Sequence, residues 1–534
     1  MDEDPALKSV AQLLLARTDD PAPGLRFENE EWSWAEVVAR SGARAAWLVD
    51  RRADELISRS APSSPPPPFN FGMLLDNVPE YCFWLGGAAL AGATVVGINP
   101  TRRGRELSRD IAHTNCQFVI TDGEHRGWLA DVDVETVDVE TVTVTDAPAV
   151  DVGIDPRTLF VLLFTSGTTG APKAVKCSQG RMVDIARKVE SMLGVTSASV
   201  FYEAMPMFHG NALMTGWSSS LAAGACVALR RKFSASQFLD DIRRFGATHT
   251  NYVGKALTYV LATAEQPNDA DNPLTVVFGN EAREADVERF GTRFGCRVIE
   301  GYGSTEGGTS INRTADTPPG SLGRGAPGTV VLDPETGAEC PPGVIGEIAN
   351  TESAARFEGY WNNAEAEHDR TRDGIYWTGD LGYTDDEGFF YFAGRNHDWL
   401  RVDGENFAAA PVERVLEQFP DIELAAVYAV PDPAAGDAVM TALELRPGAE
   451  LDADALAVFL ASHPDLGTKW MPRFIRIVAK LPMTQTNKVV KADLRDERWE
   501  CADPVWWRPA REPAYRRLTG ADRDAIAKEM AQHG

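Results

Sequence analysis

Short apolar runs alternate with amphipathic stretches through most of the chain. The runs are rich in β-branched and aromatic residues, which favours buried strands. They lie at 118–121, 158–165, 248–253, 274–279 and 296–300. Between them, segments such as 235–246 and 284–295 have the apolar spacing of helices. Strands that alternate with helices form βαβ units, so the sequence predicts an α/β fold with largely parallel sheets.

Two uncharged stretches, 81–101 and 209–229, are long enough to raise the question of a membrane span. Each contains glycines and a run typical of a strand, LAGATVV in the first and LAAGACVAL in the second. Buried α/β elements produce such patterns more often than membrane spans do. We therefore expect an apolar helix, a Gly-Ala turn and a buried strand in each stretch. The likeness between them favours two related α/β layers.

The texture of the sequence changes after residue 300, where Gly/Pro-rich turns separate short strands and indicate a β-rich subdomain. From about Trp399 helices and strands alternate again over roughly 135 residues, a size that can fold independently. The sequence predicts a large N-terminal domain over 1–397 and a small α+β domain over 398–534, so the expected fold class combines α/β and α+β.

Composition narrows the choice of partners. The chain of 534 residues has 78 acidic and 52 basic residues, and its net charge of −26 disfavours nucleic acid and anionic membranes because both carry the same sign. The seven cysteines are scattered without a C-x-x-C pair, a pattern that fits reduced thiols and offers no zinc site. The N-terminus has no signal-peptide pattern. We expect a cytoplasmic protein, free or peripheral at a membrane, without a stable membrane span and compatible with a homodimer.

The densest chemical signal is the string TSGTTGAPK, which follows the apolar run at 158–165. Glycines let backbone N–H groups turn towards an anion, hydroxyls add donors, and Lys173 supplies positive charge. The composition is that of a phosphate cradle. It is not the G-x-x-x-x-G-K-[ST] loop, because Pro172 precedes the lysine and no Ser or Thr follows it. By composition alone, a flexible Ser/Thr/Gly turn is nearly as good an interpretation.

These nine residues resemble the signature of the adenylate-forming superfamily, which comprises acyl-CoA synthetases, adenylation domains of peptide synthetases and luciferases. Further motifs of that superfamily follow in order: GYGSTEGG at 301–308, TGD at 378–380, GRNHDWLRVDGENF at 394–407 and PMTQTNKVVK at 482–491. The resemblance covers about residues 70 to 500. It implies an AMP-binding domain of two layered α/β subdomains and a β-rich subdomain, followed by a small mobile domain.

The resemblance also implies a set of ATP- and AMP-binding residues. They are Thr165, Ser166, Gly167, Thr168, Thr169, Gly170, Lys173, Gly279, Tyr302, Gly303, Asp380 and Arg395. Tyr302 would contact the adenine, and Asp380 and Arg395 the ribose. Thr305 would act near the α-phosphate and Glu306 would bind Mg²⁺, which agrees with the preference of that ion for carboxylate and phosphate oxygens. Because Glu306 stands where a dinucleotide-binding motif has its third glycine, a Rossmann site is disfavoured.

Lys488 is the most valuable single residue in this interpretation. Attack of a carboxylate on the α-phosphate brings anions together, and an ammonium group placed there stabilises the charge that develops. Lys491 is the neighbouring alternative, but the motif favours Lys488. The resemblance further implies that Asp398 is the hinge of the mobile domain and that Gly404 borders the pantetheine channel. Asn487 stands where many relatives have glycine, a departure that the fatty-acid-transport-protein branch tolerates.

Longer stretches resemble that branch, which contains very-long-chain acyl-CoA synthetases and related bile-acid and steroid-carboxylate ligases. They are MPMFHGNAL, KFSASQFLDDIRRFGATHTNYVGKAL, QPNDADNP and VFGNEAR. The branch implies an acyl pocket near His209, Tyr252, Val253 and Gly254, although His209 has a fair alternative as a hydrogen-bonded core histidine. Mammalian members carry a membrane-associated N-terminus, and we expect none here.

We therefore expect an acid–CoA ligase that uses ATP, Mg²⁺ and CoA, forms an acyl-adenylate and releases AMP and pyrophosphate. Long-chain or very-long-chain fatty acids are the leading substrates, and a steroid or bile-acid-type carboxylate is the alternative. Two other functions stay open: loading of a carrier protein from the acyl-adenylate, and lipid binding or uptake without turnover. A luciferase-like oxygenase is more remote.

Overall fold

The computed structural model describes residues 7–58, 68–100, 102–144, 153–165, 173–254, 256–280, 282, 284–314, 316–395, 399–402, 405–432, 436–463, 466, 470–483, 489–509 and 514–533. The chain divides into two compact units, Met1–Ser310 with Ser353–Gly374 and Ile311–Glu352 with Ile375–Gly534. The predicted boundary between residues 397 and 398 falls outside the described residues and stays a prediction.

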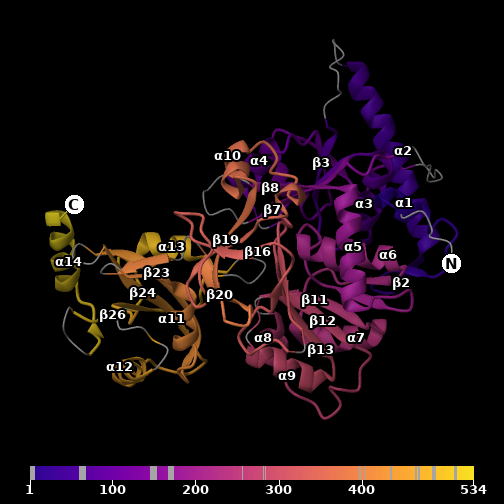
Figure 1. The fold of residues 1–534 in the computed structure, drawn as a ribbon. Helices are drawn as coiled ribbons and strands as arrows, with labels where there is room; N and C mark the ends of the chain where they lie inside the picture. The colour runs from indigo at the N-terminus through magenta and orange to yellow at the C-terminus, as the bar shows by residue number, and fades with distance from the viewer. Residues whose placement is uncertain are drawn as a thin grey trace. The chain divides into compact units, whose positions relative to one another are not determined.

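The first unit contains two largely parallel sheets covered by helices (Figure 1). In one sheet the strand order is β13-β12-β11-β9-β10-β1-β2, and β2 runs antiparallel to β1. Its strands are β1 (Pro23–Phe27), β2 (Glu30–Ser33), β9 (Val200–Glu203), β10 (Cys226–Leu229), β11 (His249–Val253), β12 (Val276–Asn280) and β13 (Arg297–Gly303). The associated helices are α1 (Val10–Leu15), α5 (Gln179–Leu193), η2 (Asn211–Trp217), α6 (Ser218–Ala223), η3 (Ala235–Gln237), α7 (Phe238–Phe245), α8 (Ala256–Leu261) and α9 (Glu284–Phe294).

The other sheet of this unit has the order β6-β5-β3-β4-β7-β8, with β8 antiparallel to β7. Its strands are β3 (Asn70–Leu74), β4 (Thr94–Gly97), β5 (Phe118–Thr121), β6 (Glu135–Asp138), β7 (Leu159–Thr165) and β8 (Lys173–Ser178). The remaining elements are α2 (Trp34–Ser58), α3 (Pro79–Ala91), α4 (Gly104–His113), η1 (Arg126–Leu129), η4 (Ala354–Arg356), α10 (Ala364–Arg370) and β18 (Thr371–Arg372). Strands β3, β4 and β5 are buried along their whole length, as expected of parallel strands covered on both faces.

The two uncharged stretches fold as helix, glycine turn and buried strand. In the first, α3 ends at Gly92 with φ +64° before β4, and in the second, α6 ends at Gly224 with φ +74° before β10. Both glycines have the left-handed conformation that closes a helix, where a side chain is disfavoured. The second stretch begins with a π-helical segment, η2, which periodicity did not predict. Among the described helices, none combines the length and apolar character that crossing a membrane requires.

The second unit begins with the β-rich part predicted after residue 300. Here β16, β17, β19 and β20 form an antiparallel sheet, and β14 pairs with β15. The bounds are β14 (Ser310–Asn312), β15 (Arg324–Gly325), β16 (Thr329–Leu332), β17 (Gly346–Asn350), β19 (Ile375–Thr384) and β20 (Phe390–Arg395).

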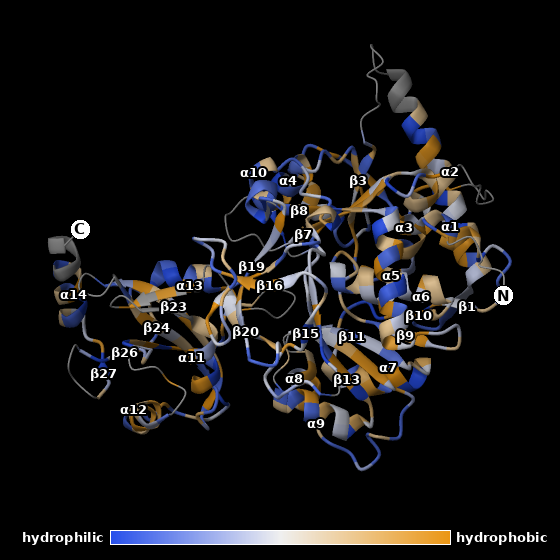
Figure 2. Cartoon of the chain, viewed as in Figure 1, coloured by the Kyte–Doolittle hydropathy of each residue, from blue (hydrophilic) through white to orange (hydrophobic). Residues whose placement is uncertain are grey.

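The C-terminal part of this unit is a sheet with helices on both faces. Its elements are β21 (Trp399–Val402), β22 (Glu405–Ala408), α11 (Ala409–Leu416), β23 (Ile422–Asp432), β24 (Gly436–Leu445), α12 (Ala453–Ser462), β25 (Phe474–Val478), α13 (Lys491–Glu497), β26 (Val505–Trp507), β27 (Arg516–Arg517) and α14 (Gly520–His533). Along β23, Ala425 and Val427 join the core that α11 and α12 cover, whereas Ala426 and Tyr428 join the core that α13 and α14 cover. Figure 2 shows this strand hydrophobic and α13 hydrophilic. The α/β and α+β class predicted from the sequence is confirmed.

Candidate nucleotide and acyl site

The carboxyl ends of three neighbouring parallel strands carry much of the predicted site. Strand β11 ends with Tyr252 and Val253 and is followed by Gly254, β12 contains Gly279, and β13 ends with Tyr302 and Gly303. The register pairs Tyr252 with Gly279 and Gly279 with Glu300. Parallel strands end at the same edge of a sheet, which is where ligands bind in open α/β folds. The structure thus gathers at one edge residues from three segments that together span about 50 positions of the sequence.

Gly279 allows a close approach that a larger residue would prevent. A Cβ atom at this position would lie 2.5 Å from Cδ1 of the Tyr252 ring and would also overlap the Tyr252 carbonyl oxygen. The Tyr252 ring is buried, and its hydroxyl donates to the carboxylate of Glu300. Glu300 also accepts from the backbone N–H of Ala282 at 3.4 Å. Sequence analysis missed Glu300, although a carboxylate at the end of an apolar strand, directly before GYGSTEGG, was an available signal.

A small apolar cavity is lined in part by residues of β11. Its volume is about 10 Å³, room for about one water molecule. Its lining comes from β9, β11, α7, α8 and their neighbours and includes Tyr252, Leu257, Val260 and Phe238. Of the four residues predicted for the acyl pocket, Tyr252 lines this cavity, whereas His209, Val253 and Gly254 are not among its lining residues.

Glu306 lies in a buried polar cluster of the first unit. Its side chain is 6% exposed, and Oε1 accepts a hydrogen bond from the Tyr360 hydroxyl at 2.9 Å. Arg370 Nε donates to the same hydroxyl at 3.2 Å. Lys173 Nζ lies 5.9 Å from the centroid of the Tyr360 ring. The structure therefore brings together Lys173, predicted to bind the nucleotide, and Glu306, predicted to bind Mg²⁺, and it adds Tyr360 and Arg370.

The surroundings of Lys173 shift the pKa of its ammonium group. Burial lowers the pKa of its ammonium group, repulsion by Arg370 lowers it further, and the carboxylates of Asp369 and Glu306 oppose the shift. Because burial and Arg370 together outweigh these two carboxylates, a further anion near the ammonium group would stabilise its charge. Thr165 and Lys173 pair directly across β7 and β8, so the two ends of the segment between them are adjacent. Ser166, Gly167, Thr168, Thr169 and Gly170 lie outside the described residues.

Thr305 is fixed through its backbone and packs against the turn that contains His209. Arg181 donates to the Thr305 carbonyl oxygen and, at 2.7 Å, to that of Lys176. A Cβ atom at Gly210 would lie 3.0 Å from Thr305 Oγ1, so the turn after His209 closely approaches the GYGSTEGG loop. His209 is half-buried, and its Nδ1 accepts from the N–H of Asn211 at 3.3 Å. The predicted nucleotide and acyl motifs are therefore neighbours in the fold.

In the second unit, Asp380 and Arg395 occupy paired positions on β19 and β20. The Asp380 N–H donates to Thr378 Oγ1 at 3.0 Å, and the Thr378 hydroxyl donates to the Ile348 carbonyl oxygen at 2.6 Å. The TGD motif therefore lies within β19, and the Thr378 hydroxyl ties it to β17. The residues predicted for the hinge, the thioester channel and the transition-state charge, Asp398, Gly404 and Lys488, lie outside the described residues.

Lys491, the alternative to Lys488, has a structural partner. Its Nζ lies 2.9 Å from Glu413 Oε1, and its side chain is 15% exposed. Glu413 Oε1 also accepts from the N–H of Val427 on β23 at 2.8 Å. Lys491 therefore joins α13 to α11 and β23, a role that leaves Lys488 as the stronger catalytic candidate.

Glu203, at the end of β9, is a buried carboxyl group that sequence analysis did not single out. It accepts hydrogen bonds from Asn251 Nδ2 and from the N–H of Met205, both at 3.0 Å. A Cβ atom at Gly216 of η2 would overlap its carboxyl oxygen, so η2 packs directly on it. Burial raises the pKa of this carboxyl group well above its ordinary value, and the two hydrogen bonds only partly oppose the shift.

This setting predicts a pH-dependent stability. Because the folded state holds the proton more tightly than the unfolded state, the contribution of Glu203 is fully present below its unfolded pKa and is lost as pH rises towards the folded value. A tenfold difference in proton affinity between the two states corresponds to about 1.4 kcal/mol. Glu203→Gln should therefore gain stability relative to the wild type as pH rises from 5 to 8, measured by thermal denaturation. Exposed Glu265 provides the control, since Glu265→Gln should show no such trend; equal trends for both variants would contradict the assignment.

The family model described as AMP-binding enzyme matches residues 15–361, and the one described as AMP-binding enzyme C-terminal domain matches residues 411–488. The chain is 46% identical to the steroid-22-oyl-CoA synthetase of Rhodococcus jostii, with 98% of each chain covered. It is 47% identical to the medium/long-chain-fatty-acid–CoA ligase FadD17 of Mycobacterium tuberculosis, covering 94% of this chain and 99% of that one.

The chain is also similar to a more distant relative and to a solved structure. Human long-chain fatty acid transport protein 5 is 29% identical, with 93% of this chain and 79% of that protein covered. The crystal structure of ATP-bound MatB from Rhodopseudomonas palustris superimposes with a TM-score of 0.79 at 25% identity, covering 91% of this chain and 98% of that one.

Proposed function

We propose, since the chain belongs to the AMP-binding enzyme family, that it is an ATP-dependent acid–CoA ligase that acts through an acyl-adenylate. The resemblance to the adenylate-forming superfamily and to its fatty-acid-transport-protein branch is confirmed by these relatives. The observation that carries the proposal is the full-length similarity, at 46% and 47% identity, to two enzymes named for acyl-CoA synthesis. The buried cluster of Glu306, Tyr360 and Lys173 supports it, because it supplies the charges that a triphosphate needs.

ATP and CoA are the co-substrates that this function requires, and Glu306 is the residue that would hold Mg²⁺. Its donor is a hard carboxylate oxygen, which suits this ion, and the Tyr360 hydroxyl orients the group by binding Oε1. Bound Mg²⁺ would neutralise charge on the phosphates. Lys173, whose Nζ lies 5.9 Å from the centroid of the Tyr360 ring, adds a second positive charge.

Of the remaining residues, some bind the nucleotide and one stabilises the charge that develops in the reaction. Tyr302 contacts the adenine, and Asp380 and Arg395 bind the ribose hydroxyls. The carboxylate of the acid attacks the α-phosphate, and the P–O bond to pyrophosphate breaks. Lys488 stabilises the negative charge that builds up in this step. Rotation at Asp398 then places Gly404 beside the pantetheine channel, where the thiolate of CoA attacks the acyl carbonyl and AMP leaves.

The two similar enzymes point to acids with a large apolar body, either a medium- or long-chain fatty acid or a steroid side-chain carboxylate. Tyr252, one of the four residues predicted for the acyl pocket, lines an apolar cavity, which is consistent with an apolar acid. The identities to the two enzymes, 46% and 47%, differ by one percentage point, so both classes of acid belong in the substrate screen.

We propose that the protein acts in the cytoplasm, free or peripheral at a membrane, and that it is compatible with a homodimer. Its cysteines are unpaired thiols. Burial raises the pKa of Cys177 and Cys226 to about 12, so these thiols resist oxidation at neutral pH.

A substrate screen tests the proposal. The enzyme is incubated with ATP, Mg²⁺, CoA and acids from C2 to C24 together with steroid carboxylates, and thioester, AMP and pyrophosphate are quantified. Each buried methylene contributes about 0.8 kcal/mol, so four of them should raise kcat/KM by about two-hundredfold over acetate. Higher kcat/KM on acetate than on every acid of C12 or longer would contradict the substrate class. Failure to form any thioester would contradict the function itself.

A further inference from the structure

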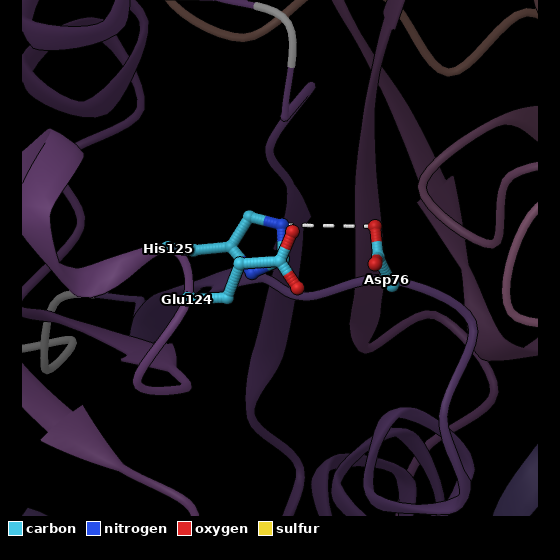
Figure 3. Close-up of side chains that lie close together, drawn as sticks. All are labelled: Asp76, Glu124 and His125. Atoms are coloured by element: carbon cyan, nitrogen blue, oxygen red, sulfur yellow. Dashed lines mark ion pairs between the residues drawn. The ribbon is translucent and has the colours of Figure 1, made fainter.

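Asp76, Glu124 and His125 lie together at the carboxyl edge of the sheet that contains β3 and β5 (Figure 3). Asp76 follows β3 by two residues, and Glu124 and His125 follow β5 by three and four. These two strands are adjacent and parallel. The chain leaves β3 through α3 towards β4 on one side, and it leaves β5 through η1 towards β6 on the other side. Neighbouring strands whose connections diverge form a topological switch point, where α/β sheets bind ligands.

The ring of His125 directs its Nε2 atom at the carboxylate of Asp76. His125 is fully buried, and its Nδ1 lies 2.6 Å from Asp122 Oδ1. A carboxylate only accepts hydrogen bonds, so Nδ1 carries a proton that it donates to Asp122, and Nε2 carries a lone pair whenever the ring is neutral. Nε2 has no hydrogen-bond partner among the described residues and lies 3.6 Å from Asp76 Oδ1. Two acceptors that face each other in a buried position need a proton or a metal cation between them.

The arrangement of His125 is one that metal ligands commonly have. A histidine that binds a metal ion through one ring nitrogen usually donates from the other to a carboxylate, which fixes the ring and its tautomer. Asp122 provides that carboxylate, and its Oδ1 also accepts from the His125 backbone N–H at 2.9 Å. The ligand-facing nitrogen is therefore oriented before any ion arrives.

The distances suit a small divalent ion. Zinc–ligand bonds of about 2.0–2.2 Å in a tetrahedral site place neighbouring ligand atoms about 3.3 Å apart. Asp76 Oδ1 and His125 Nε2 are 3.6 Å apart, and one ligand atom from each of the three residues lies within 4.8 Å of the others. The Glu124 side chain is 58% exposed and can move the remaining distance. One imidazole and two carboxylates form a donor set that suits zinc.

Lys232 occupies the neighbourhood as a competing cation. Its Nζ lies 3.1 Å from Asp76 Oδ2 and 3.5 Å from Glu124 Oε1. The side chain is 61% exposed, so the ammonium group can leave without breaking packing. Two carboxylates face this one ammonium, which leaves negative charge for an additional cation.

We propose that Asp76, Glu124 and His125 bind a divalent metal ion of the zinc type, at a site distinct from Glu306. The adjacent Asn77 connects this site to the stretch MPMFHGNAL, which contains His209. Its side chain donates to the Met205 carbonyl oxygen at 2.9 Å and accepts from the Met207 N–H at 2.8 Å. An ion at the switch point would therefore stiffen the segment that leads to His209.

Calorimetric titration of the full-length, chelator-treated protein with Zn²⁺ alone, in buffer without ATP and Mg²⁺, tests the proposal. The expected result is one saturable site whose affinity falls at least tenfold in Glu124→Gln and in His125→Gln. Lys232→Met should bind Zn²⁺ more tightly than the wild type, because it removes the competing cation. His368→Gln, which changes an exposed histidine on α10, should leave the affinity unchanged.

Glu124 and Lys232 are exposed, so their variants report on binding even where a change at buried His125 impairs folding. Thermal denaturation without zinc establishes that each variant is folded. The absence of a saturable site, or equal affinities for the wild type, Glu124→Gln and Lys232→Met, would overturn the proposal. Neither result bears on the ligase function, which is measured separately with Mg²⁺.

Discussion

Lys488→Ala should reduce acyl-adenylate formation by about a hundredfold to a thousandfold while leaving the conversion of supplied acyl-adenylate and CoA to thioester largely intact. The reason is that negative charge builds up between carboxylate, α-phosphate and pyrophosphate only in the first half-reaction. Pyrophosphate release and thioester formation from synthetic acyl-adenylate measure the two steps separately. Lys480→Ala, which changes an exposed lysine of the same domain, serves as the matched control and should keep both activities.

The opposite pattern is expected for the residues assigned to domain rotation. Gly404→Leu should form acyl-adenylate but transfer it poorly, because a side chain there narrows the pantetheine channel. Asp398→Pro should do the same by fixing φ at the hinge. Circular dichroism establishes folding for each variant. If Lys488→Ala and Gly404→Leu lose both steps in equal proportion, the alternation of two domain orientations is wrong for this protein.

Glu306→Gln should lower kcat/KM for ATP by about a hundredfold or more, and added Mg²⁺ should not restore it, because the amide cannot replace the charge of the carboxylate. Tyr360→Phe should have a smaller effect, about tenfold, since it removes only the hydrogen bond to Oε1. Initial rates of pyrophosphate release across a Mg²⁺ series measure both.

Glu365→Gln, on the exposed side of α10, is the control for the loss of one negative charge in the same unit. Near-normal turnover of folded Glu306→Gln at limiting Mg²⁺ would remove Glu306 from the metal site. An equal loss in Glu306→Gln and Tyr360→Phe would indicate that the cluster acts through folding instead.

The local pattern was sufficient for elements built around a continuous buried apolar run. The apolar runs at 118–121 and 158–165 became β5 and β7, and the helix–turn–strand interpretation of 81–101 became α3 and β4. The stretch 209–229 was predicted less well, since it begins with the π-helical η2. Its Gly216 packs on buried Glu203, a contact between distant elements that periodicity does not contain.

Some residues of the candidate site could likewise be identified from local motifs, whereas others depend on contacts between distant segments. Glu306 and Lys173 were identified through motifs, but Tyr360 and Arg370 were not, because they lie more than 50 residues after the motif they support. The pairing of Glu300 with Tyr252 likewise depends on β11 and β13 flanking β12. Strand order is a long-range property, and no local pattern specifies it. The metal site at β3 and β5 was invisible in the sequence for that reason.

The claim that the reaction passes through an acyl-adenylate is tested most directly by following the carboxylate oxygens of the acid into the products. An acid labelled with ¹⁸O in both carboxylate oxygens is converted with ATP and CoA, and the products are examined by mass spectrometry. An acyl-adenylate route predicts that AMP carries one ¹⁸O, the thioester carries the other, and pyrophosphate carries none. Label in inorganic phosphate with formation of ADP, or AMP free of label, would contradict the account.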